Sequence, residues 1–211
     1  MNRLSLSVLF TAAVLFVATG FVGSTDEASV LDDRPSAATW SVDQAHSNVG
    51  FAVRHLGIST VQGSFRSYDA TLDFDPDDLT TLSTTAEIAV ASVDTRNDRR
   101  DNHLRSDDFF HVEEHPTMRF ESTRVQNVNG DTFEVVGELT IKDVTREVVL
   151  AATLNGVAAF QGNEVAALTA ETVIDRHDYG LTWSRVTEAG GLVVGRDVTI
   201  TLEIEAAREQ A

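Results

Sequence analysis

Apolar and polar residues alternate with period two along most of the chain after residue 40, and this alternation constrains the fold more than any other feature. The clearest case is the last apolar run, where Val198, Ile200, Leu202 and Ile204 alternate with threonine and glutamate. Successive side chains of a strand point to opposite faces, so the pattern predicts strands with one buried face and one wetted face.

Turn signals separate these runs at Asn129-Gly130, Asn155-Gly156 and Gly190-Gly191. Short turns between alternating runs are typical of hairpins, and about eight antiparallel strands fit the chain. We therefore expect an all-β fold, and prefer an up-and-down antiparallel barrel to an immunoglobulin-type sandwich. The sandwich would lack a cavity and would not need the charged segment described next.

Residues Asp94 to Thr117, DTRNDRRDNHLRSDDFFHVEEHPT, interrupt the strand pattern with charged and turn-forming residues. We expect this segment to form a short helical insertion that covers one end of the barrel. A covered barrel with an apolar interior would be a container.

The first residues have the layout of an export signal, with Arg3 before a long apolar run that ends in small residues. We expect a signal peptide over residues 1–24, a flexible linker over 25–38 and one folded domain over 39–208. The apolar run is also close to the ~20 residues that span a bilayer, so an uncleaved anchor stays an alternative. Cleavage is the preferred expectation, and it predicts a periplasmic or otherwise exported protein.

The chain has a formal net charge of -17 and a sequence pI near 4.5. Nucleic-acid binding needs clusters of Lys and Arg against the phosphates, so the charge argues against it. An acidic surface that repels itself at low salt is also compatible with a high-salt habitat, which stays a hypothesis.

No nucleophile motif is present, because the chain has no cysteine and no Gly-x-Ser-x-Gly elbow. His111 and His115 have the i, i+4 spacing of a helical metal clamp, but Pro116 disfavours helical backbone at His115. We therefore expect no metal site, no catalytic residue and no required cofactor.

Four blocks in order resemble the YceI family. They are WSVDQAHSNVGFAVRHLGISTVQGSF (40–65), SVDTRNDRRDNHLRSDDFFHVEEHPTMRF (92–120), GELTIKDVTREVVL (137–150) and DRHDYGLTW (175–183). The resemblance implies a lipocalin-like barrel, usually periplasmic and often a homodimer, that encloses an isoprenoid or similar lipid. The chain departs from the family pattern at His111, where an acidic residue is usual, and at Gly57, where a bulkier one is common.

The function expected from pattern and resemblance together is that of an exported carrier for a long-chain lipid, such as a quinone or polyprenyl chain. Binding would come from burying CH₂ groups, each worth about 0.8 kcal/mol. The residues expected to line the tunnel are apolar and lie on the predicted strands and cover: Phe51, Val53, Phe65, Phe74, Ile88, Phe109, Phe110, Phe120, Leu139, Ile174 and Trp183.

The polar end of such a ligand needs donors at the tunnel mouth, and the candidates are His46, Asp101, His103 and Arg176. Transient membrane contact is expected as well. Two other classes stay open: an exported stress or structural module with a solid core, and an enzyme acting on a lipid with His103 and Asp101 as an acid/base pair.

Overall fold

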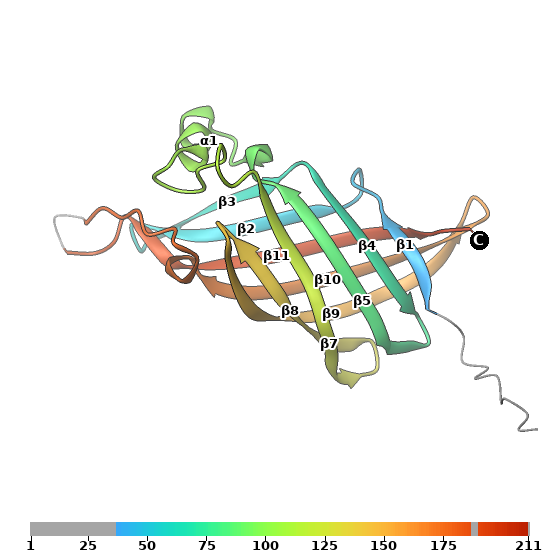
Figure 1. Ribbon diagram of the computed structural model, residues 1–211. Helices are drawn as coiled ribbons and strands as arrows, with labels where there is room; N and C mark the ends of the chain where they lie inside the picture. The colour runs from blue at the N-terminus through green and yellow to red at the C-terminus, as the bar shows by residue number, and fades with distance from the viewer. Residues whose placement is uncertain (1–36, 187–189, 211) are drawn as a thin grey trace, which may run out of the picture. The chain divides into compact units, whose positions relative to one another are not determined.

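The computed structural model describes residues 37–186 and 190–210 (Figure 1). Its strands are β1 (Ala38–Val42), β2 (Asn48–His55), β3 (Ser59–Phe65), β4 (Tyr68–Asp75), β5 (Asp78–Ala89), β6 (Val93–Asp94), β7 (Thr117–Asn129), β8 (Thr132–Ile141), β9 (Val144–Phe160), β10 (Asn163–Asp175) and β11 (Val194–Arg208). One α-helix, α1 (Asp98–Arg105), and two short 3-10 helices, η1 (Val90–Ser92) and η2 (Arg176–Tyr179), complete the described elements.

The strands close on themselves, in the order β1-β4-β5-β7-β8-β9-β10-β11, because β1 pairs with both β4 and β11. Every pairing between these strands is antiparallel, and the sheet continues from β11 through β2 and β3 to β6. The result is a closed eight-stranded antiparallel barrel with one helix, which confirms the predicted fold class.

The connection between β6 and β7 carries α1 at one end of the barrel, as the charged segment predicted (Figure 1). Asn97 caps the helix by accepting a hydrogen bond from the backbone of Arg100, and acidic residues lie in the first turn with basic ones in the last. Both ends of the described chain lie at the opposite end of the barrel. Within the described part of the chain, no helix is long and apolar enough to cross a membrane.

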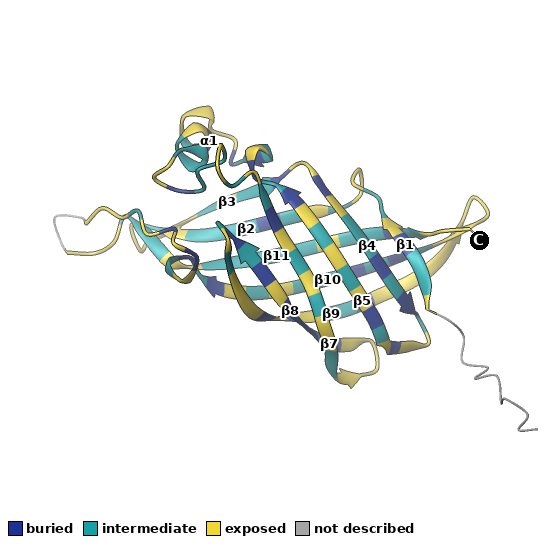
Figure 2. Ribbon diagram, in the orientation of Figure 1, coloured by how far each residue is buried: buried dark blue, intermediate teal, exposed yellow. Residues whose placement is uncertain are grey.

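Buried apolar residues form two clusters in the barrel. Figure 2 shows the buried positions along the strands. At the end that carries the termini, Trp40 stacks on Phe74 with ring centroids 4.9 Å apart, and both side chains are 0% exposed. Cross-strand aromatic packing of this kind closes that end of the barrel.

One predicted turn is wrong. Asn155 and Gly156 lie inside β9, and the chain reverses instead at Gln161 and Gly162. A register shift between β9 and β10 lies opposite Gly156, whose φ of 148° suits glycine. The turn signal therefore marked a bulge, while the turn at Asn129-Gly130 is confirmed.

The predicted signal peptide, residues 1–24, and linker residues 25–36 lie outside the described residues. Strand β1 begins at Ala38, one residue before the expected start of the domain.

Candidate functional site

An apolar cavity of about 260 Å³ lies inside the barrel. Its wall is made of side chains from every strand of the closed ring, with only Val42 from β1, and from β2, β3 and the segment that carries α1. Few polar groups reach it, chiefly threonines, Tyr68 and Arg176. A cavity needs a volume of roughly 10–15 Å³ to hold one water molecule, so this cavity has room for a much larger ligand.

Nine of the eleven residues expected to line a tunnel do line this cavity: Phe51, Val53, Phe65, Ile88, Phe109, Phe110, Phe120, Leu139 and Ile174. The other two are corrections. Phe74 packs against Trp40 in the solid closure of the far end, and Trp183 lies outside the cavity lining, with its ring 5.0 Å from that of His103. Alternation identifies the inward face but not the level along the barrel, so it could not separate these two from the rest. Contact of the nine with a ligand stays a prediction.

Two glycines place aromatic rings against the wall. A Cβ on Gly63 would lie 2.4 Å from the ring of Phe51, and a Cβ on Gly137 would lie 2.5 Å from the ring of Phe120. Because no side chain stands there, both rings lie directly over the backbone of the neighbouring strand. These close approaches keep the rings from filling the cavity.

The two ends of the cavity are built differently. The stacked rings of Trp40 and Phe74 close the first end. At the second end, which carries α1, Phe109 of the cover lines the cavity and is buried, while Val53 and Val194 of the wall are only partly buried. We call this second end the mouth.

Arg176 lies at the mouth and lines the cavity, but its guanidinium is already engaged. It donates to the carbonyl oxygens of Trp183 and Gly195 at 2.8 Å each, to Val194 at 3.3 Å and also to Leu181. The side chain is 3% exposed, and burial lowers its pKa, although an arginine stays charged. Arg176 therefore holds the β10–β11 connection in place.

Tyr68, which the sequence did not single out, lines the cavity with its ring. It is 6% exposed, and its hydroxyl is buried with no hydrogen bond of good geometry to the described residues. Burial raises the pKa of Tyr68, and the Ser47 hydroxyl beside it opposes that rise. The phenol is therefore neutral, and its oxygen lies against the turn that carries Ser47.

Asp101 and His103 do not form an acid/base pair. Asp101 is buried and accepts a hydrogen bond from the backbone of Thr95 at 2.9 Å and another from its hydroxyl, which fixes the start of the cover. His103 contacts Asp108 through Nε2 at 2.8 Å and packs edge-on against Phe109 and Trp183. Both side chains are committed to the structure of the cover.

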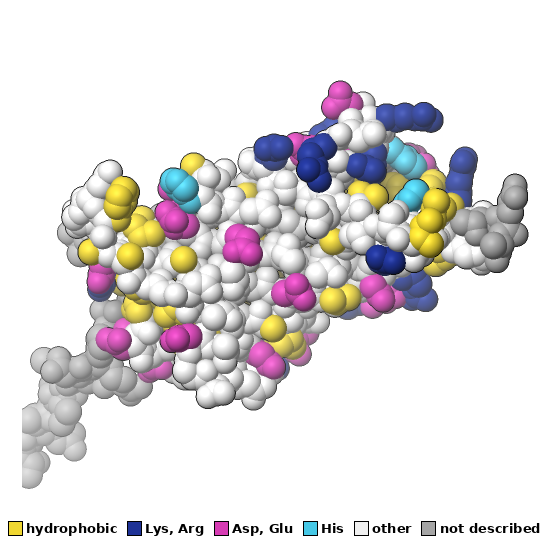
Figure 3. Space-filling model, turned by 180° about the vertical axis from the view of Figure 1, so that it is seen from behind, with side chains coloured by type: hydrophobic (Ala, Val, Ile, Leu, Met, Phe, Trp, Pro, Cys, Tyr) yellow, Lys and Arg dark blue, Asp and Glu magenta, His cyan; other side chains and the backbone are white. Residues whose placement is uncertain are grey.

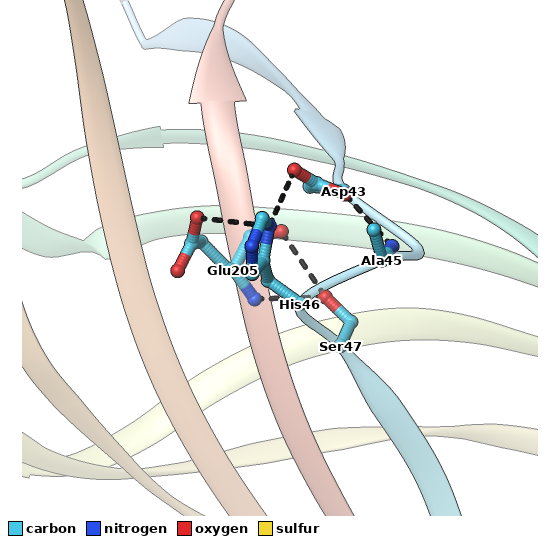
Figure 4. A network of polar contacts seen from close by, with 5 residues as sticks. All are labelled: Asp43, Ala45, His46, Ser47 and Glu205. Atoms are coloured by element: carbon cyan, nitrogen blue, oxygen red, sulfur yellow. Dashed lines mark hydrogen bonds and ion pairs between the residues drawn. The ribbon is translucent and has the colours of Figure 1, made fainter. Parts of the chain in front are cut away.

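His46 lies away from the mouth, on the outside of the barrel between β1 and β2 (Figure 4). Its Nδ1 is 2.9 Å from a carboxylate oxygen of Asp43 and 3.7 Å from one of Glu205. The hydrogen bond with Asp43 raises the pKa of His46, and the same bond lowers the pKa of Asp43. His46 is thus a surface ion-pair residue, which corrects its expected place at a headgroup.

Two groups in the described residues could hold a metal ion by geometry: Asp43, His46 and Glu205, and His111, Glu114 and His115. The second group shows that Pro116 does not separate the histidines as expected. The backbone N–H of His115 donates to the carbonyl of His111 at 2.9 Å, and the rings lie 6.1 Å apart. Ion pairs account for both groups, and the absence of a metal site stays a prediction.

Comparisons with known proteins agree with this architecture. The model of the YceI-like domain matches residues 40–206. A UPF0312 protein of Staphylococcus epidermidis is 39% identical over 168 residues, which cover 79% of this chain and 95% of that protein. The YCEI protein of Campylobacter jejuni superposes with a TM-score of 0.65 at 35% identity, over 80% of this chain and 96% of the other.

A third structure is described as a polyisoprenoid binding domain from Saccharophagus degradans implicated in plant cell wall breakdown. It superposes with a TM-score of 0.60 over 82% of this chain and 99% of the other, at 15% identity. At that identity the likeness establishes a shared fold.

Proposed function

The chain belongs to the YceI-like family, and from this membership and the cavity we propose that it is an exported carrier that encloses a long-chain isoprenoid or related lipid. The resemblance seen in the sequence is confirmed by the family match over residues 40–206. The ligand, the export and the carrier role are the proposal.

The cavity carries this proposal. Cavities in protein cores cost about 24 cal/mol per Å³, so 260 Å³ left empty would cost about 6 kcal/mol. That is a large part of the roughly 5–15 kcal/mol by which domains are stable. An apolar space of this size is best explained by an apolar guest that fills it, because water gains little there.

The cavity's shape favours a chain-like ligand. It extends from Leu82 and Leu168 near the sealed end to Val53 and Val194 at the mouth. A chain can thread along this length, and each CH₂ removed from water adds about 0.8 kcal/mol without any polar contact. Selectivity would then follow chain length and branching.

Tyr68 is our candidate for a ligand oxygen: its buried hydroxyl lies beside Ser47 without a hydrogen bond of good geometry to the described residues, and a small turn of the side chain would bring it to a ligand. A quinone carbonyl or a prenyl alcohol would satisfy it with one hydrogen bond. Arg176 retains a supporting role, because its positive charge lies in the wall and no carboxylate of the described residues is bonded to it.

A pair of neighbouring substitutions tests the carrier. Ala152 is buried and lines the cavity, while Ala151 is exposed on the outer face of the same strand. Ala152→Phe should block the tunnel, and a loss of three buried CH₂ groups would weaken binding of a long prenyl alcohol about fiftyfold. Ala151→Phe is the matched control.

The readouts are native mass spectrometry for co-purifying lipid and titration with the prenyl alcohol. Equal affinity of both folded variants would contradict binding inside the barrel. Failure of the unsubstituted protein to bind any long-chain isoprenoid, alcohol or quinone, would refute the proposed ligand class.

The alternatives have less support. The enzyme hypothesis relied on Asp101 and His103, whose side chains bond Thr95 and Asp108. The solid-core hypothesis has to account for a 260 Å³ cavity. Homodimer formation, periplasmic location and the high-salt habitat stay predictions.

A further inference from the structure

We propose that the mouth end of the barrel docks on a lipid bilayer with anionic headgroups, with exposed apolar side chains of two neighbouring loops inserted among the lipids. The first loop joins β2 to β3 and the second joins η2 to β11. We call residues 54–60, Arg185, Val186 and residues 190–196 together the lip. The inference deepens the proposed carrier function and rests on it for its purpose, but its test is separate.

The lip exposes large apolar side chains. Ile58 is 81% exposed, Val186 67%, Leu56 43% and Leu192 39%. Scattered single apolar residues are ordinary on a protein surface, but a group of four on two adjoining loops marks an interaction site.

The two loops are joined by backbone hydrogen bonds, so they are held together. The N–H of Leu56 donates to the carbonyl oxygen of Val193 at 2.9 Å, and the N–H of Val193 donates to the carbonyl oxygen of Arg185 at 2.8 Å. Val186 and Leu192 form a β-bridge, and Arg54 donates to the carbonyl of Gly57 at 2.9 Å. The described apolar residues of the two loops therefore lie side by side.

The described lip residues are basic in a chain that is acidic overall. The whole chain has 33 acidic residues and a net charge of -17, yet residues 54–60, 185–186 and 190–196 contain no acidic residue, although Glu188 follows in the sequence between the last two ranges. Arg54, Arg185 and Arg196 lie in the lip, and Arg196 pairs with Asp175. Figure 3 shows basic side chains, with acidic ones among them, at the end of the molecule that carries α1. Basic residues beside apolar side chains fit an anionic bilayer surface.

The acidic charge near the Trp40 end does not prevent this docking, whereas the cover at the mouth end has seven acidic residues and four arginines over residues 94–117, so attraction to anionic lipid has to come from the lip itself. Strand β11 has 15 residues and spans roughly 50 Å at about 3.4 Å per residue. Screening acts over about 8 Å at physiological ionic strength, so charges near the Trp40 end are screened from the bilayer. Repulsion from the far end weakens further as salt rises.

The lip adjoins the cavity directly. Val53 and Val194 line the cavity, and Val194 pairs with His55 in the wall beside the lip. Insertion of Ile58 and Val186 would therefore bring the mouth against the acyl region of the bilayer. A lipid could then move between bilayer and barrel with little exposure to water.

The absence of cysteine from the chain permits a direct test with one label per protein. Ile58→Cys and Phe160→Cys are each coupled to an environment-sensitive fluorophore and mixed with vesicles of phosphatidylcholine, with or without phosphatidylglycerol. Phe160 is the matched control, since it is 63% exposed in β9 near the opposite end. We expect a blue shift, and quenching by lipid-borne quenchers, at position 58 only and mainly with phosphatidylglycerol.

The two labelled proteins are identical apart from the labelled position. Attachment through the N-terminal apolar run therefore cannot by itself produce a different spectral shift at positions 58 and 160. No shift at position 58, or an equal shift at 160, overturns the proposal. A shift at 58 that follows protein concentration without vesicles would assign the lip to a second copy, and would overturn it too.

A second variant separates docking from lipid capture. Ile58 does not line the cavity, so Ile58→Asp should lower partition onto phosphatidylglycerol vesicles roughly tenfold or more while capture of detergent-dispersed prenyl alcohol is unchanged. Vesicle partition unchanged by Ile58→Asp refutes the docking surface. Capture absent from the unsubstituted protein, with docking intact, refutes the carrier function alone.

Discussion

Replacing Arg176 with methionine, a side chain of similar length without the guanidinium, should destabilise the barrel strongly. The guanidinium makes hydrogen bonds to four backbone carbonyls of the β10–β11 connection. Hydrogen bonds with a charged partner contribute about 1.5–3 kcal/mol each, and burial of the charge offsets several kcal/mol of that sum. We expect a net loss of about 3–5 kcal/mol in the free energy of unfolding.

Arg196→Met is the control for this change. Arg196 is an arginine of the same region, but its side chain is 54% exposed and pairs with Asp175 at the surface. Exposed ion pairs contribute little to stability because solvent screens them, so this variant should remain close to the unsubstituted protein.

Urea unfolding followed by circular dichroism measures both free energies. For a domain of this size 1 kcal/mol corresponds to about 2–4 °C, so Arg176→Met should also lower Tm by roughly 6–20 °C. Arg176→Lys should recover only a small part of the loss, because an ammonium cannot reach the same carbonyls as a planar fork. Equal stability of the Arg176→Met and Arg196→Met variants would refute the structural role assigned to Arg176.

Three further predictions concern the wall and the surface. Gly63→Ala should cost about 1–3 kcal/mol in unfolding free energy, because its Cβ would meet the Phe51 ring at 2.4 Å; a neutral effect would contradict that close approach. Tyr68→Phe should weaken binding of a prenyl alcohol about fivefold and leave a hydrocarbon of equal length unaffected, and equal losses in calorimetric titrations would argue against a hydrogen bond to the ligand. The His46–Asp43 pair should stabilise the fold fully between the ordinary aspartate pKa of 3.8 and the ordinary histidine pKa of 6.5. This stabilisation should be lost as the pH rises through the raised pKa of His46, and also as it falls through the lowered pKa of Asp43. In an NMR titration Asp43→Asn should lower the pKa of His46, and an unchanged value would exclude the pair as the cause.

Sequence patterns predicted the barrel well because strand periodicity is a local property. Val198, Ile200 and Leu202 point inward as their alternation requires, and each lines the cavity. The charged segment after β6 was also recognisable as a cover, since its polarity and turn residues could not continue a strand. Periodicity says nothing about distance along the barrel axis, so Phe74 was grouped with residues of the cavity.

The polar part of the site was harder to predict because it depends on what each side chain already bonds. Arg176 and Asp101 looked available in the sequence, but backbone groups of neighbouring loops occupy both. Tyr68 looked like an ordinary inward-facing aromatic residue, and only the folded barrel shows that its hydroxyl has no bonding partner among the described residues. The exposed lip likewise needs two loops distant in sequence to meet.

The barrel is closed by the first and last strands of the domain, and this seam determines when folding can finish. Only three residue pairs join β1 to β11, from Trp40 with Arg208 to Val42 with Ala206. They bring together positions separated by nearly the whole domain, and such long-range contacts are slow to form. The ring can close only after the last strand is available, so a chain that lacks Ala206 to Arg208 would leave its apolar interior open to other chains.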